Sequence, residues 1–119
     1  AFAQAICCDI HPFNNIRVIN HLRQQFGAND DAIQIWLNRW MQEGFESLEK
    51  LIEPYYSGQF CFGEKPTFAD CCLIPQFYNA IRFNVPVNRF DKLKAIYNHC
   101  NTLDAFHKAA PQNQVDAEE

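Results

Sequence analysis

The segment from Gly63 to Phe83 limits most strongly what this chain can fold into, because it carries the start, body and end of one helix. Thr67 and Asp70 have the spacing of a capping box, in which the hydroxyl and the carboxylate each accept a hydrogen bond from the other residue's amide. The residues after them are mostly apolar, and Pro75 lies among them. Such a helix is stable only where other helices surround it, and its proline is expected to bend it. We predict a buried, kinked core helix.

The longest regular pattern in the sequence follows Asn29, which is succeeded by two aspartates in the manner of a typical helix cap. Apolar residues then recur at three- and four-residue spacing, as expected of a long amphipathic helix: Ile33, Leu37, Trp40, Met41, Phe45, Leu48 and Ile52. Shorter helices are predicted over residues 1–10, 89–100 and 103–109. No stretch alternates with a period of two. The predicted fold class is therefore all-α, a bundle of about five to six helices.

Pro12 is expected to stop the first helix, because the residue before a proline is pushed out of the α region. Asn14 or Asn15 can cap a second piece, which is predicted to run to Phe26 with Gly27 as its C-terminal stop. One apolar stripe is expected on this second helix: Ile16, Ile19, Leu22 and Phe26.

Composition places the chain among packed single domains. Its 119 residues are 48% hydrophobic and 14% aromatic, which is ample for a core. A net charge of -4 argues against a nucleic-acid partner, which requires clustered Lys and Arg. No apolar run has the length of a membrane span and no signal peptide is visible, so a cytoplasmic location is expected.

The cysteines form two adjacent pairs and two single residues: Cys7, Cys8, Cys61, Cys71, Cys72 and Cys100. None has the C-x-x-C spacing of a metal or redox site, and the histidines lack ligand spacing, so no metal site is predicted. Cys71, Cys72 and Cys100 are expected to be buried as small apolar side chains rather than to form disulfides. A reactive thiol at Cys7 or Cys8 is the less favoured alternative.

The core helix also resembles a known family. Thr67 and Asp70, followed by Leu-Ile-Pro-Gln and Asn-Ala-x-Arg-Phe, resemble the central helix of the C-terminal domain of glutathione transferases. The detail is similar to the zeta class, the maleylacetoacetate isomerase family. Residues 8–18 resemble the segment by which bacterial zeta enzymes contact glutathione, and residues 105–117 resemble the family's C-terminus. The likeness therefore runs from one end of the chain to the other.

The resemblance implies that residues 1–119 are the C-terminal helical domain of such an enzyme. The chain has no initiator methionine, no strand-rich beginning and no Ser-Ser-Cys-type motif. In the family that motif lies in an N-terminal thioredoxin-like domain and activates the glutathione thiol. We therefore expect that domain as a partner, a homodimer as the assembly, and no catalytic residue or activity in the isolated chain.

The resemblance also assigns ligand contacts. The matching His and Asn of bacterial zeta enzymes bind glutathione, which implies this role for His11 and Asn15, although the residues alone indicate only a loop histidine and a helix cap. The matching core-helix arginine binds a substrate carboxylate, which implies this role for Arg82, with Arg17 as a second contact. Guanidinium groups are permanently charged and suit carboxylates. Without the resemblance, Arg82 would stabilise its helix end and Arg17 would be solvated.

The implied reaction is glutathione-dependent cis–trans isomerisation of maleylacetoacetate, in tyrosine and phenylalanine breakdown, or of maleylpyruvate. A thiolate adds to the cis double bond, the resulting single bond rotates, and elimination returns the trans isomer. Thr67 and Asp70 are expected to be structural. The alternative is a non-catalytic helical module of transferase ancestry that mediates protein association. The presence of His11, Asn15 and Arg82 favours the enzyme.

Overall fold

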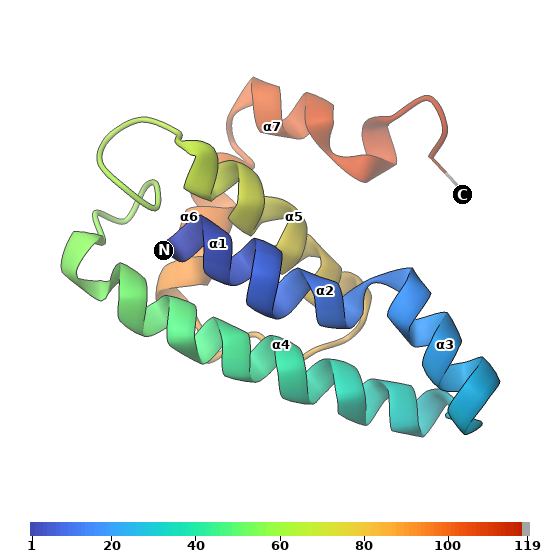
Figure 1. The fold of residues 1–119 in the computed structure, drawn as a ribbon. Coiled ribbons are helices and arrows are strands. Elements are labelled where there is room, and N and C mark those ends of the chain that lie inside the picture. The colour runs from blue at the N-terminus through green and yellow to red at the C-terminus, as the bar shows by residue number, and fades with distance from the viewer. Residues whose placement is uncertain (118–119) are drawn as a thin grey trace.

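The computed structural model describes residues 1–117, and over these residues it is a bundle of helices without strands (Figure 1). The helices are α1 Phe2–Gln4, α2 His11–Asn14, α3 Ile16–Phe26, α4 Asp30–Ile52, α5 Phe68–Arg82, α6 Asp91–Cys100 and α7 Asp104–Ala109. A π-helical segment, Ala5–Ile10, joins α1 to α2, and 3₁₀ turns lie at Glu53–Tyr55 and Pro111–Asn113. The predicted all-α fold is confirmed.

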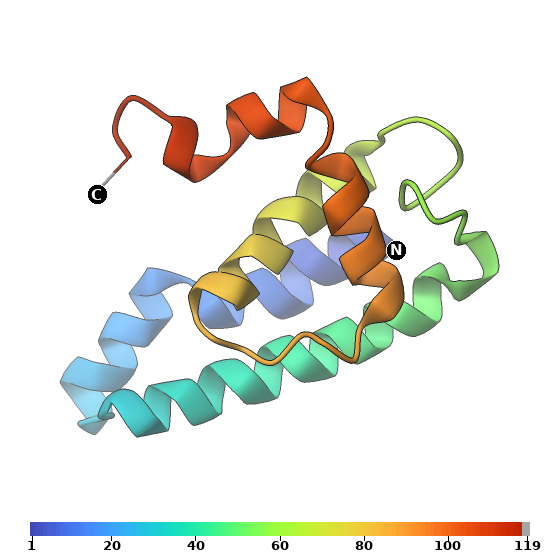
Figure 2. The same cartoon turned by 180° about the vertical axis from the view of Figure 1, so that it is seen from behind.

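The core lies between α4 and α5. The continuous helical run from α1 to α2 flanks it on one side and α6 on the other (Figures 1 and 2). Phe77 of α5 stacks on Phe45 of α4 at 5.6 Å between ring centres, and Phe90 meets Phe45 edge-on. The predicted apolar stripe of α4 is buried except at one position, since Trp40 is only half-buried: Ile33, Leu37, Met41, Phe45, Leu48 and Ile52. Burial of these faces is the main stabilisation of the fold.

The predicted capping box is present at the start of α5. Asp70 is completely buried, and its Oδ2 accepts from the Thr67 amide at 2.8 Å and from the Thr67 hydroxyl at 3.1 Å. Its other carboxylate oxygen accepts from the Cys61 amide at 2.8 Å. Asp70 therefore caps α5 and also holds the loop that precedes the helix.

The prediction that the first helix stops before Pro12 is wrong. The chain stays helical to Asn14, because the segment Ala5–Ile10 widens into a π-helix and Pro12 falls in the first turn of α2, where a backbone donor is not needed. The break comes at Asn15, whose ψ of 140° is extended. Asn15 caps α3 and Gly27 ends it in the left-handed region, as predicted.

Gly44 allows the π-helical segment to approach α4 closely. A Cβ at position 44 would fall within 2.6 Å of Ile10 Cδ1, and Ile10 is almost fully buried. Glycine has no Cβ, so the side chain of Ile10 can pack directly against the backbone of α4 at Gly44. This contact fixes the end of the π-helical segment immediately before His11.

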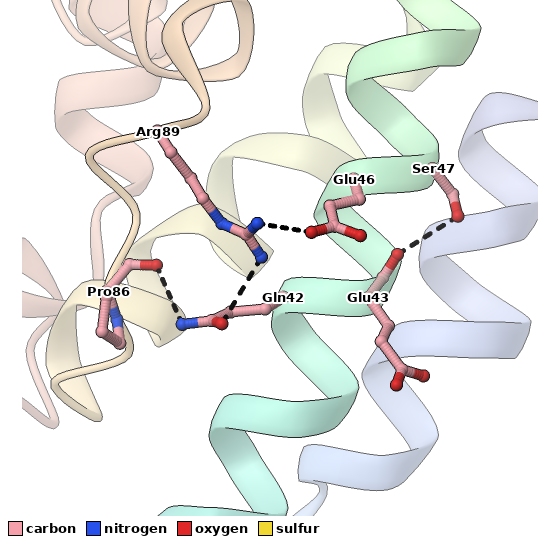
Figure 3. Close-up of polar contacts among 6 residues, drawn as sticks. All are labelled: Gln42, Glu43, Glu46, Ser47, Pro86 and Arg89. Carbon is pink, nitrogen blue, oxygen red and sulfur yellow. Dashed lines mark hydrogen bonds and ion pairs between the residues drawn. The ribbon is translucent and has the colours of Figure 1, made fainter.

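The connection between α5 and α6 is tied to the polar side of α4 (Figure 3). Arg89 forms an ion pair with Glu46 and donates to Gln42 Oε1 at 3.4 Å, while Gln42 Nε2 donates to the Pro86 carbonyl at 3.4 Å. These exposed contacts each contribute little free energy, and together they set the path of the loop.

The predicted apolar stripe of α3 is only partly buried, and one cysteine that we expected to be buried is exposed. On α3, Ile16 and Phe26 are 64% and 74% exposed, because the helix extends from one end of the bundle and meets few other elements (Figure 1). Cys71 is also exposed, since it lies on the side of α5 that faces away from the core. Cys72 is half-buried and Cys100 is buried.

Candidate functional site

An open hollow of about 620 Å³ lies at the break between α2 and α3. His11 and Asn15 both line it, as do two further polar side chains, Arg17 and His21. Its apolar wall comes from Pro12, Val18 and Leu22. The hollow thus combines hydrogen-bonding groups and a positive charge with a short apolar surface, which suits a small anionic ligand.

Aromatic contacts with α4 hold the helix break in place. Trp36 Nε1 donates to the Phe13 carbonyl at 2.7 Å. The Phe13 ring stacks on Trp40 at 4.6 Å between ring centres. Trp36 and Trp40 therefore position the backbone between His11 and Asn15. The indole hydrogen bond is short, and its carbonyl partner is freed by the interrupted helix.

In the described part of the chain, only the oxygen of the Asn15 side-chain amide takes part in a hydrogen bond that supports the fold. Its Oδ1 accepts from the Arg17 amide at 3.0 Å as the cap of α3, and Nδ2 has no hydrogen-bond partner among residues 1–117. Asn14 behaves differently, because it is buried and neither of its side-chain amide atoms has a partner in that range. The structure therefore assigns the cap, which the sequence left open, to Asn15.

Arg82 lies at the end of α5, in a second hollow of about 410 Å³. Tyr78 and the C-terminal tail line the same hollow, including Gln114 and Asp116. The next residue, Phe83, accepts at its carbonyl from Gln34 Nε2 of α4 at 2.9 Å. The end of α5 is thus fixed while the Arg82 side chain stays exposed.

Arg17 and Arg82 differ from the chain's other arginines. The remaining three form ion pairs with carboxylates: Arg23 with Asp30, Arg39 with Glu43, and Arg89 with Glu46. Within residues 1–117, no carboxylate pairs with Arg17 or Arg82. In the part of the chain that the structure describes, these two guanidinium groups have no carboxylate partner and suit one from outside.

The structure does not bring Arg17 and Arg82 into one hollow. Arg17 lies with His11 and Asn15, and Arg82 lies with the tail. Both regions are nevertheless attached to the same part of α4, through Gln34 to Phe83 and through Trp36 to Phe13.

Sequence reasoning missed two residues that line these hollows. The sequence indicated no ligand role for His21 or Tyr78, which line the hollows of Arg17 and Arg82 respectively. Each lies four residues from a predicted site residue on the same helix, His21 after Arg17 and Tyr78 before Arg82. Residues at this spacing share a helix face, so the pattern was present in the sequence.

Among the described residues, no group of three or more His, Cys, Asp and Glu side chains could hold a metal ion. Nor does any helix in that range have the length and apolar character needed to cross a membrane.

Comparison with known proteins identifies the fold. Maleylpyruvate isomerase of Ralstonia sp. is 42% identical over 119 residues, and the match covers 98% of this chain and 56% of that protein. A solved structure of maleylpyruvate isomerase, described as a bacterial zeta-class glutathione transferase, superposes with a TM-score of 0.94 at 41% identity, covering 98% of this chain and 56% of that one. Over nearly its whole length the chain matches zeta-class glutathione transferases. The resemblance seen in the sequence is confirmed, as is the match of the fold to their C-terminal helical domain.

A further family structure has ligands bound. Maleylacetoacetate isomerase of Methylobacterium extorquens AM1, with malonate and glutathione bound, superposes with a TM-score of 0.90 at 28% identity, covering 99% of this chain and 56% of that one. The chain thus spans about half the length of the relatives it matches. No family model matches the chain.

Proposed function

We propose that this chain is the helical half of a glutathione-dependent cis–trans isomerase acting on maleylacetoacetate or maleylpyruvate. One observation carries the proposal: Arg17 and Arg82 have no ion pair within residues 1–117. Every other arginine has one. An unpaired guanidinium in a hollow is suited to hold the carboxylate of a ligand.

Glutathione binding is proposed for the hollow at the helix break. His11 offers ring nitrogens at the exposed start of α2, and Asn15 offers the Nδ2 donor that the cap leaves unused. When bound there, glutathione would supply the thiolate that adds reversibly to the cis double bond. The role of His11 and Asn15 is to hold that ligand in a fixed position, which lowers the entropic part of the barrier.

Substrate binding is proposed for Arg82, with Arg17 as the second contact. Arg82 would hold one carboxylate of the maleyl compound while the carbon–carbon bond rotates, and Arg17 would approach from the glutathione side. The bound malonate of the Methylobacterium enzyme, itself a dicarboxylate, supports a family site of this chemical class. The hydrogen bond from Gln34 to the Phe83 carbonyl holds the backbone next to Arg82 in place.

The domain arrangement is also a proposal. We place residues 1–119 beside an N-terminal thioredoxin-like domain that activates the thiol, in a protein that forms a homodimer. The relatives, about twice as long as this chain, support a second domain of similar size. The alternative of a non-catalytic association module has no specific observation in its favour.

Replacing His11 by alanine in the complete protein is expected to raise KM for glutathione roughly three- to tenfold, because one hydrogen bond to the ligand is lost. Asn15→Ser is expected to do the same, because serine keeps the capping oxygen but removes the Nδ2 donor. Steady-state kinetics at varied glutathione concentration measure the effect. Gln24→Ala, on the exposed surface of α3 outside the hollow, is the matched control and should leave KM unchanged. Unchanged KM in both site variants would contradict the glutathione assignment.

A further inference from the structure

Two cysteines that are distant in sequence meet on the surface of the bundle. Cys7 of the π-helical segment and Cys72 of α5 are separated by 65 positions, and their Sγ atoms lie 3.7 Å apart. Cys7 is exposed and Cys72 is half-buried, and both are free thiols. The two helices that carry them pack directly on each other. Neither thiol is used in the proposed isomerisation.

We propose that Cys7 and Cys72 form a reversible dithiol–disulfide site, which exchanges with low-molecular-weight disulfides such as oxidised glutathione. A disulfide bond is about 2.05 Å long and joins side chains from backbones that are already close. The two Sγ atoms, now 3.7 Å apart, therefore need to approach each other to about 2.05 Å. The two segments that carry them are in contact, so side-chain rotation can contribute to that movement.

The chemistry begins at Cys7, which is the more exposed thiol. Its thiolate attacks one sulfur of the small disulfide, a bond to Cys7 Sγ forms, and the first small thiolate leaves with the electron pair of the broken bond. The Cys72 thiolate then attacks Cys7 Sγ and releases the second small thiolate. The protein loses two protons and two electrons in total, and one small disulfide becomes two thiols.

The pair differs from the other cysteines in both contact and access. Burial raises the pKa of Cys72 to about 11, which makes it the slower thiol and fits its role as the second to react. Cys61 and Cys100 are fully buried, and burial together with the Asp70 carboxylate raises the pKa of Cys100 to about 12. Those two thiols are therefore inert toward a small disulfide.

The bond would connect the two parts of the candidate site. Cys7 lies one helical turn before His11, and Cys72 lies on the helix that ends at Arg82. A link between them closes a long loop, and such links reduce the entropy of the unfolded chain. We expect the oxidised protein to melt roughly 5–15 °C higher than the reduced protein.

The test is to treat the purified full-length protein with oxidised glutathione, block the remaining thiols, digest with trypsin and quantify linked peptides by mass spectrometry. Cys7→Ser and Cys72→Ser remove the pair. Cys8→Ser and Cys71→Ser are matched controls, because each replaces the exposed neighbour of a pair member. A linked peptide that is present in the wild type and in both controls, and reduced at least tenfold in both pair variants, is the expected result.

Three outcomes would overturn the proposal. The first is a linked peptide of equal abundance in all four variants, and the second is the presence of mixed disulfides with glutathione alone, since either means that the two thiols do not pair. The third is a melting temperature that is unchanged or lower after oxidation of the wild type, because a link that fits the folded state is expected to stabilise it. Dithiothreitol should return the oxidised protein to its original melting temperature.

Discussion

Replacing Arg82 by alanine in the complete protein is expected to lower kcat/KM for a maleyl dicarboxylate roughly ten- to hundredfold. A hydrogen bond to a charged group contributes about 1.5–3 kcal/mol, and the Arg82 side chain, which has no ion pair within residues 1–117, can make one with a substrate carboxylate. Activity toward an uncharged electrophile should remain nearly intact, because only the dicarboxylate requires the guanidinium. Steady-state kinetics with both substrates measure the difference.

Two further variants sharpen this experiment. Arg82→Lys should restore only part of the activity, since an ammonium group does not reproduce the two-point contact of a guanidinium. Arg39→Ala is the matched control, because Arg39 is exposed and already paired with Glu43 on its own helix. Equal losses for the charged and uncharged substrates would show that Arg82 supports the fold or glutathione binding, and the carboxylate assignment would then be wrong.

Asp70→Ala should lower the free energy of unfolding by about 3–5 kcal/mol. Its buried carboxylate accepts from the Thr67 and Cys61 amides at 2.8 Å each, so the substitution removes two charge-assisted hydrogen bonds and leaves the buried Cys61 amide without a partner. Both the start of α5 and the preceding loop lose their support. Urea unfolding of wild type and variant gives the change directly.

The control for Asp70 is Thr67→Val, which removes the capping hydroxyl and keeps the side-chain shape. This variant should lose only about 1 kcal/mol, the usual cost of a lost helix cap. If Asp70→Ala costs no more than Thr67→Val, the hydrogen bond to Cys61 adds nothing and Asp70 is only a cap.

Local signals predicted the parts of the fold that depend on neighbouring residues. Thr67 with Asp70, Asn29 before its two aspartates, and Gly27 after an amphipathic run each mark a helix end through backbone groups within four residues. The structure has these helix ends where the sequence placed them. The buried stripe of α4 was readable for the same reason, because helical periodicity is a local property.

Pro12 shows where local reasoning fails. The proline rule considers one residue and its predecessor, whereas the observed π-helical segment ends at Ile10, whose side chain packs closely on Gly44 of α4. That contact joins residues distant in sequence. Exposure of Ile16 and Phe26 has the same origin, since a stripe on α3 is buried only if another element covers it.

The candidate site was predictable only in part. Resemblance supplied His11, Asn15, Arg17 and Arg82, and their roles remain predictions. The ion pairs of Arg23 and Arg89, and the separate hollows of Arg17 and Arg82, depend on how helices meet in space. The contact between Cys7 and Cys72 depends on the same packing, and no spacing rule indicates it.

The most direct measurement is the rate of cis–trans isomerisation of maleylacetoacetate and of maleylpyruvate, with and without glutathione, by the complete protein and by the 119-residue chain alone. We predict turnover of at least one substrate by the complete protein only when glutathione is present, and no turnover above background by the isolated chain. Isomerisation without glutathione, turnover by the isolated chain, or no turnover by the complete protein would contradict the proposed function.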